Sequence, residues 1–265
     1  MRLEEVERSR PETVALSDRL QPAYQKSSKV IREAVSDRGG GVRSRGERPP
    51  TRGAPKEKGT AFMKLTTTTQ VSVDGVMQGN GGLHDLDRRT GFARGGWARL
   101  LFDSEAMTFV DQVYQRADAF LFGRRTYDVF AGYWGAMAYP GSGPIADALN
   151  ARPKYVASNT LTEPRWADTT VLSGDLAAAI GELKAKPAGE LQVHGSGALT
   201  RWLLENDLVD EMNLLIVPVV VGQGTRLFPA TGPDIALDLV ESRAFPKGIT
   251  IQVYRPAGRP QYATD

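Results

Sequence analysis

The sequence has no cysteine and only two histidines, His84 and His194, among its 265 residues. The lack of cysteine excludes disulfides, cysteine nucleophiles, iron–sulfur clusters and Cys-based zinc sites. The two histidines lie far apart and share no metal-ligand spacing, so no metal site is expected. No stretch approaches 18 uninterrupted apolar residues, and no basic segment followed by an apolar one opens the chain. We therefore expect a cytoplasmic protein without a membrane-spanning segment.

Aromatic residues are scarce at the start of the chain. Residues 1–62 contain only Tyr24 and Phe62, against nineteen aromatics in the other 203 residues, and they carry 14 Lys and Arg against 9 Asp and Glu. Such a segment cannot bury enough apolar surface to fold, so residues 1–62 are predicted to be a disordered or dispensable extension and 63–265 the folded domain. A basic arm could also contact nucleic acid. The charges are mixed and no aromatic platform accompanies them, so no nucleic-acid partner is expected.

From Lys64 onward, strand patterns alternate with helix patterns. Strands are predicted at residues 64–73, 119–122, 155–157, 170–172, 191–194, 212–221, 236–242 and 249–254, and helices at 104–116, 125–134, 175–186 and 198–206. The run at 212–221 is apolar enough for a fully buried strand. This order predicts a three-layer α/β/α fold with a mostly parallel central sheet and an antiparallel C-terminal hairpin.

In such a sheet, ligands bind where strands end and turns lead into helices. At residues 194–199 the sequence reads His-Gly-Ser-Gly-Ala-Leu between a predicted strand and a predicted helix. Glycines let a phosphate approach the backbone, and the helix N-terminus offers free N–H groups. The third glycine of a dinucleotide fingerprint is missing, because Thr200 stands there. The turn is therefore either a phosphate site or simply a tight strand-to-helix turn.

A second turn, Gly123-Arg124-Arg125-Thr126, places two guanidinium groups at a helix start. Cations oppose the helix dipole there, which favours an anionic ligand over a solvated basic turn. Ser158 and Asn159 follow the next strand, where they either contact a ligand or cap the turn.

A second ligand is suggested by the long, glycine-rich loop at 75–99, since long loops in compact domains are commonly functional. Asp74 begins it, and Trp97 near its end either covers a flat ring or packs at the sheet edge. Asp103 and Glu105 either face a substrate or belong to a helix cap.

Five segments together resemble the reductase family of the dihydrofolate-reductase-like fold. They are Ser72-Val73-Asp74-Gly75, Arg94-Gly95-Gly96-Trp97, residues 122–127, residues 193–197 and residues 217–228. The relatives are the reductase domain of the bifunctional riboflavin-biosynthesis deaminase-reductase and the stand-alone bacterial proteins similar to it. Each motif is modest, but the five occur in the family's order and span nearly all of 63–255.

The resemblance implies NADPH-dependent hydride transfer to a small planar C=N or C=O substrate, pterin-like or pyrimidine-like, in a homodimer. By it, Gly123, Arg124, Arg125 and Thr126 line the adenosine-phosphate side, Ser158 and Asn159 hold the adenosine or its 2′-phosphate, and Gly195, Ser196, Gly197, Ala198 and Leu199 cradle the pyrophosphate. Asp74 and the 75–82 loop lie near the nicotinamide and substrate, with Trp97, Asp103 and Glu105 as substrate-side candidates. The proton comes from Asp74, another acid near the loop, or water.

The sequence departs from the family in two places. The position of the folate reductase carboxylate falls near Met107, which disfavours dihydrofolate as the substrate. The deaminase half is absent, since no cysteine can supply its zinc ligands. The alternative to an enzyme is a nucleotide-binding module of the same fold without turnover.

Overall fold

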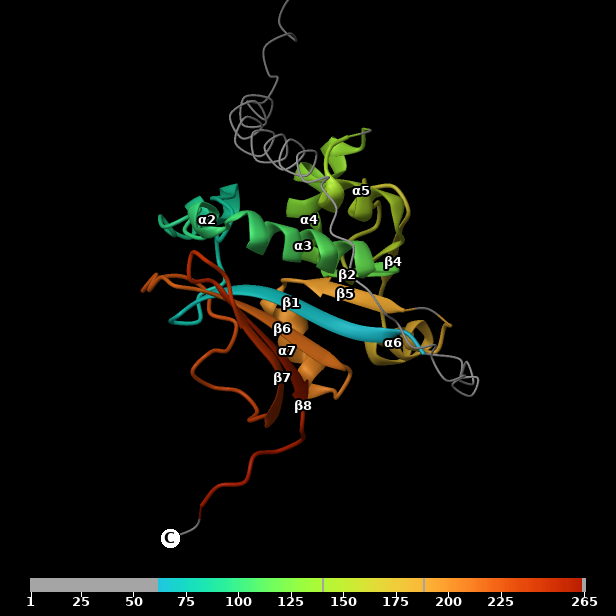
Figure 1. Cartoon of the computed structure of the whole chain (residues 1–265). Coiled ribbons are helices and arrows are strands. Elements are labelled where there is room, and N and C mark those ends of the chain that lie inside the picture. The colour runs from blue at the N-terminus through green and yellow to red at the C-terminus, as the bar shows by residue number, and fades with distance from the viewer. Residues whose placement is uncertain (1–61, 140, 188, 264–265) are drawn as a thin grey trace, which may run out of the picture. The chain divides into compact units, whose positions relative to one another are not determined.

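The computed structural model describes residues 62–139, 141–187 and 189–263 (Figure 1). These residues form an eight-stranded sheet with the order β4-β3-β2-β5-β1-β6-β8-β7. Neighbouring strands are parallel from β4 to β6, whereas β8 pairs antiparallel with β6 and β7. The strands are β1 Lys64–Ser72, β2 Ala119–Gly123, β3 Lys154–Ala157, β4 Thr169–Leu172, β5 Glu190–His194, β6 Glu211–Val217, β7 Leu237–Ala244 and β8 Thr250–Pro256.

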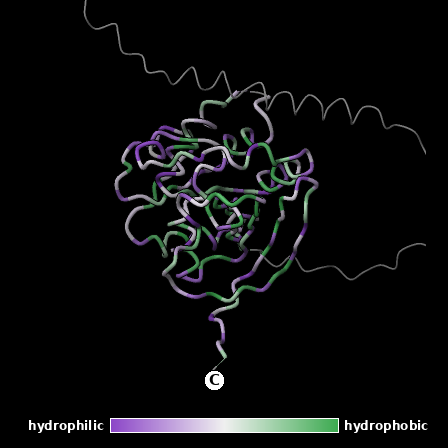
Figure 2. Tube along the Cα trace, turned by 90° about the vertical axis from the view of Figure 1, so that its left-hand side faces the viewer, coloured by the Kyte–Doolittle hydropathy of each residue, from purple (hydrophilic) through white to green (hydrophobic). Residues whose placement is uncertain are grey.

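Helices cover both faces of the sheet, which gives the predicted three layers (Figure 1). They are α2 Asp85–Arg89, α3 Ser104–Arg116, α4 Arg124–Tyr133, α5 Pro144–Ala151, α6 Leu176–Lys184 and α7 Gly197–Glu205, with 3₁₀ turns at Arg99–Leu101 and Gly135–Met137. Helices α3, α4 and α5 enclose one apolar core, and α6 and α7 enclose the other. Hydrophobic segments accordingly cross the middle of the folded unit (Figure 2). Across the described ranges, no helix combines the length and the apolarity needed to cross a membrane.

The parallel pairing places the functional turns together. Gly123 pairs with Ala157, and Thr68 of β1 pairs with His194, so β1, β2, β3 and β5 end at the same edge of the sheet. The turns that follow these strands therefore share one edge, which is the edge where ligands bind in open α/β sheets.

The predicted strands and helices are confirmed to within a few residues, with one clear error. The buried strand predicted over 212–221 ends at Val217, because the chain turns at Pro218, which has no N–H to donate. Val220 is 73% exposed rather than buried. Instead of extending the sheet, this segment forms a loop whose Val219 carbonyl accepts a hydrogen bond from the Val73 N–H.

Two helices were not predicted. The loop at 75–99 contains α2, and α5 lies between the predicted helix at 125–134 and β3. The extension predicted over residues 1–62 lies, apart from Phe62, outside the described residues.

Candidate functional site

Two of the predicted turns lie against each other at the carboxyl edge of the sheet. β2 and β5 are neighbouring parallel strands, so the turns after Gly123 and His194 leave the sheet side by side. The Ser196 hydroxyl donates a hydrogen bond of 2.6 Å to the Thr126 hydroxyl oxygen. A Cβ atom at Gly123 would lie 2.5 Å from the Ser196 Oγ, so this approach requires glycine.

The helices that follow these two turns begin without a side-chain cap. Helices α3 and α6 are capped by the carboxylates of Asp103 and Asp175, which accept hydrogen bonds from first-turn N–H groups. Helices α4 and α7 begin at Arg124 and Gly197 with no such cap. Helix α5 also lacks one, but it opens with Pro144, which has no N–H. The first turns of α4 and α7 therefore offer backbone donors at the positive ends of two helix dipoles, an arrangement that suits anions.

The segment before α7 is shaped by close backbone contact. Gly195 and Ser196 both have positive φ angles, of 73° and 59°. A Cβ atom at Gly197 would lie 2.6 Å from the Met77 Sδ, so the loop after β1 lies directly against this turn. Ala198 and Leu199 complete the predicted set; Leu199 is buried in the core, so only its backbone can face a ligand.

Ser158 and Asn159 hold the turn between β3 and β4. The Ser158 Oγ accepts hydrogen bonds from the Thr160 and Leu161 N–H groups at 3.2 and 3.1 Å. The Asn159 Oδ1 accepts one from the Gly174 N–H at 3.3 Å. These contacts support the capped-turn interpretation of both side chains, while the pairing of β2 with β3 places the turn next to the start of α4.

The two arginines of the second turn have different partners. The Arg124 Nε donates to both carboxylate oxygens of Asp128 one helical turn later, at 3.0 and 2.9 Å. The Arg125 Nη2 donates to Asp87 Oδ1 at 2.6 Å. Asp87 lies in α2 and is 1% exposed, so Arg125 ties the start of α4 to the loop that follows β1.

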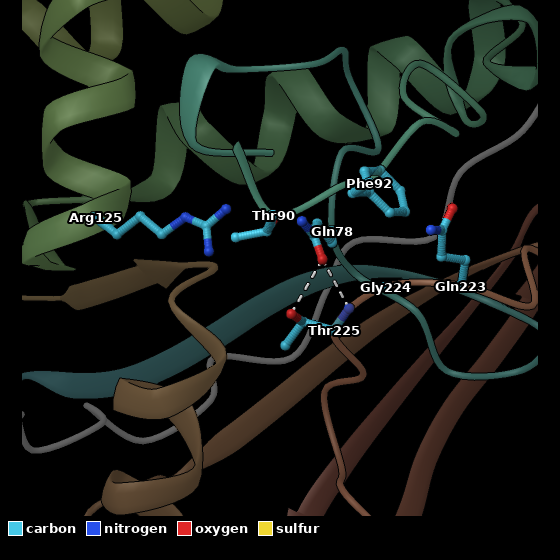
Figure 3. A pocket seen from close by; sticks show the side chains of 7 residues that line it. All are labelled: Gln78, Thr90, Phe92, Arg125, Gln223, Gly224 and Thr225. Atoms are coloured by element: carbon cyan, nitrogen blue, oxygen red, sulfur yellow. Dashed lines mark hydrogen bonds between the residues drawn. The ribbon is translucent and has the colours of Figure 1, made fainter. Parts of the chain in front are cut away.

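A cavity of about 270 Å³ lies beside Arg125 at this edge of the sheet (Figure 3). Its other lining residues are Gln78, Thr90, Phe92, Gln223, Gly224 and Thr225. The Gln78 amide oxygen accepts hydrogen bonds from the Thr225 N–H and hydroxyl at 2.9 and 3.1 Å, and its nitrogen donates to Asp87 at 2.8 Å. The cavity thus lies between the loop at 75–99, the loop at 218–226 and the start of α4, which hydrogen bonds hold together.

Asp74 anchors one of these loops. Its carboxylate accepts hydrogen bonds from the Ser72 hydroxyl at 2.6 Å and from the Val221 and Gly222 N–H groups at 2.9 and 2.8 Å. The Ser72 hydroxyl and these N–H groups hold the pKa of Asp74 well below its usual range. A carboxyl group with such a pKa is ionised at neutral pH, so these contacts support an anchoring role rather than the predicted proton-donor role.

Two arginines complete the attachment of the loop at 218–226. The Arg226 Nε donates to the Asp74 carbonyl at 2.8 Å, and its Nη2 lies 3.4 Å from Asp74 Oδ2. From the long loop at 75–99, the Arg94 Nη1 donates to the Val221 carbonyl. The Arg94-Gly95-Gly96-Trp97 motif therefore contributes to the position of this loop.

The three substrate-side candidates have structural partners. The Trp97 indole N–H donates to the Gln78 carbonyl at 2.8 Å, and its ring packs on both the main core and a small cluster around Phe92. Asp103 caps α3. The hydrogen bond that its carboxylate accepts from the Ala106 N–H lowers the pKa of this carboxyl group. Glu105 pairs with the Arg243 guanidinium at 3.2 Å. Neither acid lines the cavity beside Arg125.

His194 belongs to the core rather than to the site. Its ring stacks on Tyr114 with centroids 4.0 Å apart, and its Nε2 lies 2.8 Å from the Gln192 Oε1. Burial lowers the pKa of His194 to about 3, so the ring is neutral at pH 7. In the part of the chain that the structure describes, no group of three or more His, Asp or Glu side chains could hold a metal ion.

Sequence reasoning did not single out several residues that line the cavity or its wall. Among them are Gln78, Asp87, Thr90, Phe92 and Thr225, although Gln78 lies in the 75–82 loop predicted near the substrate. Thr225 lies in a segment quoted for the family resemblance, and Gln78 directly precedes the glycine-rich stretch at 79–82. Asp87 carries no such signal, because Asp-Leu-Asp-Arg-Arg has the composition of a solvated helix face.

The sheet order, the antiparallel C-terminal hairpin and the helices on both faces define a dihydrofolate-reductase-like α/β fold. Residues 63–251 match the family described as the RibD C-terminal domain, and the chain belongs to this family. Among curated proteins, the chain is 26% identical over 189 residues to the uncharacterized protein YyaP of Bacillus subtilis (strain 168), covering 69% of this chain and 90% of YyaP. It is 22% identical over 154 residues to YwjB of the same organism, covering 58% of this chain and 83% of YwjB.

Solved structures show the same fold. One is a protein named for riboflavin biosynthesis from Shewanella sp. PV-4, with a TM-score of 0.56 and 23% identity, covering 74% of this chain and 99% of that one. Another is a pyrimidine reductase-like protein from Corynebacterium diphtheriae, with a TM-score of 0.50 and 14% identity, covering 74% and 92%. At these identities the similarity establishes the fold alone.

Proposed function

We propose that the chain is an NADPH-dependent reductase that transfers a hydride to a small planar heterocycle through a C=N or C=O bond. The observation that carries this proposal is the pair of uncapped helix starts, α4 and α7, joined by the Ser196–Thr126 hydrogen bond beside two arginines. Two adjacent anion sites suit the phosphates of a dinucleotide better than those of a mononucleotide. Membership of the RibD C-terminal domain family and the pyrimidine reductase-like name of one structural relative support the same reaction class.

The residues present fit such a cofactor. Gly195 and Ser196 are half-buried with positive φ angles, so the backbone of the turn can receive a pyrophosphate there, whereas Gly197 is buried against Met77. Arg124 uses only its Nε toward Asp128, and it follows Gly123, whose strand partner Ala157 directly precedes Ser158. We assign Gly123, Arg124, Arg125 and Thr126 to the phosphates and the Ser158–Asn159 turn to the adenosine end.

When bound, the reduced nicotinamide supplies the hydride. The chain positions the two reactants and excludes water. Neither role requires particular residue types, so neither can be recognised from the sequence. Because Asp74 is ionised and fully hydrogen-bonded, we assign the proton to water or to another acid, and Asp74 to holding the loop at 218–226. The substrate class is a pterin-like or pyrimidine-like ring, including ribosylaminouracil as in riboflavin synthesis.

The reaction is tested by following the absorbance of NADPH with pterin, pyrimidine and quinonoid acceptors. Oxidation of NADPH that depends on one acceptor is the expected result. Binding of NADPH without oxidation by any acceptor would support the alternative, a nucleotide-binding module of the same fold. One observation favours that alternative: Asp74, Asp103 and Glu105, the predicted acids, are all engaged in structural contacts.

We also propose that the protein is a homodimer. β7 is an edge strand, and its Leu239 and Val240 are 56% and 47% exposed, which suits pairing with a second copy. Light scattering on the purified chain is expected to give twice the mass of one chain, and a single-chain mass would contradict the dimer.

A further inference from the structure

Asp87 is a buried carboxylate whose partners come from three different segments. It is 1% exposed, and it accepts hydrogen bonds from the Gln78 Nε2 at 2.8 Å, the His84 N–H at 3.0 Å and the Arg125 Nη2 at 2.6 Å. A buried carboxylate is costly unless it is paired and hydrogen-bonded, so all three donors matter to it. Asp87 therefore fixes the relative positions of the loop after β1, helix α2 and the start of α4.

These contacts continue across the cavity as a chain of hydrogen bonds. Arg125 donates to Asp87, Asp87 accepts from the Gln78 amide nitrogen, and the Gln78 amide oxygen accepts from Thr225. Because Asp87 can only accept, the amide of Gln78 has one orientation, with its oxygen toward Thr225. Figure 3 shows the two hydrogen bonds between Gln78 and Thr225, with Arg125 at one side of the same cavity.

Arg125 is held at one end of this chain with most of its donors unused. Asp87 is its only hydrogen-bond partner in the part of the chain that the structure describes, and that bond uses Nη2 alone. A guanidinium has five N–H donors, and the Arg125 side chain is 51% exposed where it lines the cavity. Its remaining donors are therefore free to bind an anionic group that enters the cavity.

We propose that Asp87 is a positioning residue, which holds the Arg125 guanidinium in the orientation that receives a phosphate of the dinucleotide. This inference rests on the proposed function, because the phosphate belongs to the proposed cofactor. Asp87 itself does not touch the ligand; it acts through Arg125 and, through Gln78, on the loop that carries Thr225. A residue that only stabilised α2 would change the melting temperature of the protein but not its preference for ligands that carry phosphate.

Asp87→Asn distinguishes a positioning effect on NADPH binding from a simple charge effect, because the two change the affinity for NADPH in opposite directions. The amide is uncharged and has one accepting oxygen for the three donors, so the hydrogen bond to Arg125 loses its charge assistance and NADPH binding weakens, by about tenfold for one charged hydrogen bond. Simple removal of a negative charge near a phosphate would instead tighten binding. The matched control is Asp85→Asn, which makes the same charge change in the same helix, where the Asp85 side chain is 86% exposed in its pair with Arg88.

The experiment is calorimetric titration of the full chain and its variants with two probes, NADPH and reduced nicotinamide riboside, which has no phosphate. For Asp87→Asn and for Arg125→Gln we expect the dissociation constant of NADPH to rise about tenfold and that of the riboside to stay the same. The double variant should lose no more than either single variant, because both changes remove one interaction. Asp85→Asn should match the wild type.

Unchanged or tighter NADPH binding by Asp87→Asn would overturn the positioning role while leaving the proposed function intact. Equal losses for both probes would also overturn it, because they would mark a structural role only. If the wild type binds no NADPH, the proposed function and this inference both fail. Should Asp87→Asn not fold, Asp87→Glu keeps the charge but displaces it; we expect NADPH binding between wild type and Arg125→Gln, and wild-type binding would overturn the proposal.

Discussion

At the residue scale, Asp74 has a carboxylate that accepts hydrogen bonds from one side chain and two backbone N–H groups of another loop. These donors favour the charged form, so the pKa of Asp74 is lower in the folded than in the unfolded chain, where it has the ordinary value of 3.8. The resulting stabilisation is complete above pH 3.8 and is lost as the pH falls further toward the folded-state pKa.

Asp74→Asn is therefore expected to lower the melting temperature at pH 7 and to flatten its decline in acid. An amide in place of the carboxylate presents an NH₂ group to at least one N–H donor. The measurement is the melting temperature of both proteins at intervals from pH 7 to about pH 2, with Asp85→Asn as an exposed control. Parallel curves for the wild type and Asp74→Asn would contradict the anchoring role.

His194 gives a second pH dependence, at higher pH. Its folded pKa of about 3 lies below the ordinary value of 6.5, so the unfolded chain binds the proton more readily. This contribution to stability is present above pH 6.5 and is lost toward pH 3, by up to about 1.4 kcal/mol per pH unit. His194→Phe keeps a ring against Tyr114 and should show a shallower fall in unfolding free energy between pH 6.5 and 4.5 by urea denaturation. An equal slope would show that the buried ring does not carry this dependence.

At the scale of elements, the caps divide the helices into two groups. Asp103 and Asp175 satisfy the first turns of α3 and α6, whereas α4 and α7 begin without a side-chain cap at the edge where the glycine turns meet. In a capped helix the side chain already accepts hydrogen bonds from the first-turn N–H groups, whereas in an uncapped helix a bound anion can accept them. On this contrast we base the proposal that the starts of α4 and α7 bind a ligand.

Asp103→Ala is expected to destabilise the protein by about 1 kcal/mol, the usual cost of losing an N-cap. It should leave the dissociation constant of NADPH unchanged, because Asp103 binds the Ala106 and Lys247 N–H groups rather than a ligand. Urea denaturation and calorimetric titration give the two quantities. Glu105→Gln is the control, since an exposed ion pair such as Glu105–Arg243 is worth less than about 1 kcal/mol. Weaker NADPH binding by Asp103→Ala would restore Asp103 as a site residue.

The sequence predicts most elements because their signals are local. β1 and β2 are β-branched or apolar runs that end at Ser72 and Gly123, and α3 starts at an evident cap. Helix α5 was missed because it is short and follows a glycine-rich stretch without a capping side chain. The strand predicted to reach residue 221 failed because its apolar pattern continues past Pro218, where a lack of an N–H ends the pairing.

The site was only partly predictable for a different reason. The glycine turns at 123 and 195 are visible in the sequence because each needs glycine: Gly195 has a positive φ, and Gly123 leaves room for the Ser196 side chain. Asp87, by contrast, becomes a buried hub only when Gln78 and Arg125 reach it from distant segments. No local pattern separates such an aspartate from its exposed neighbour Asp85.

At the scale of the whole molecule, we predict that the folded domain begins at Met63. Met63 is 5% exposed, and its N–H donates to the carbonyls of Lys184 and Lys186. A chain that starts at Met63 is therefore expected to keep the melting temperature and the NADPH affinity of the full chain. Differential scanning calorimetry and titration test this, and a lower melting temperature would show that earlier residues contribute to the fold.

The central claim is that the joined starts of α4 and α7 form a dinucleotide site. The most direct measurement is a titration of the full chain with NADPH and with NADH, followed by tryptophan fluorescence. We expect micromolar binding of NADPH and weaker binding of NADH, with the difference reduced in Arg124→Gln because Arg124 lies beside the Ser158 turn. Absence of binding by either cofactor would contradict the account and leave the glycine turns as turns alone.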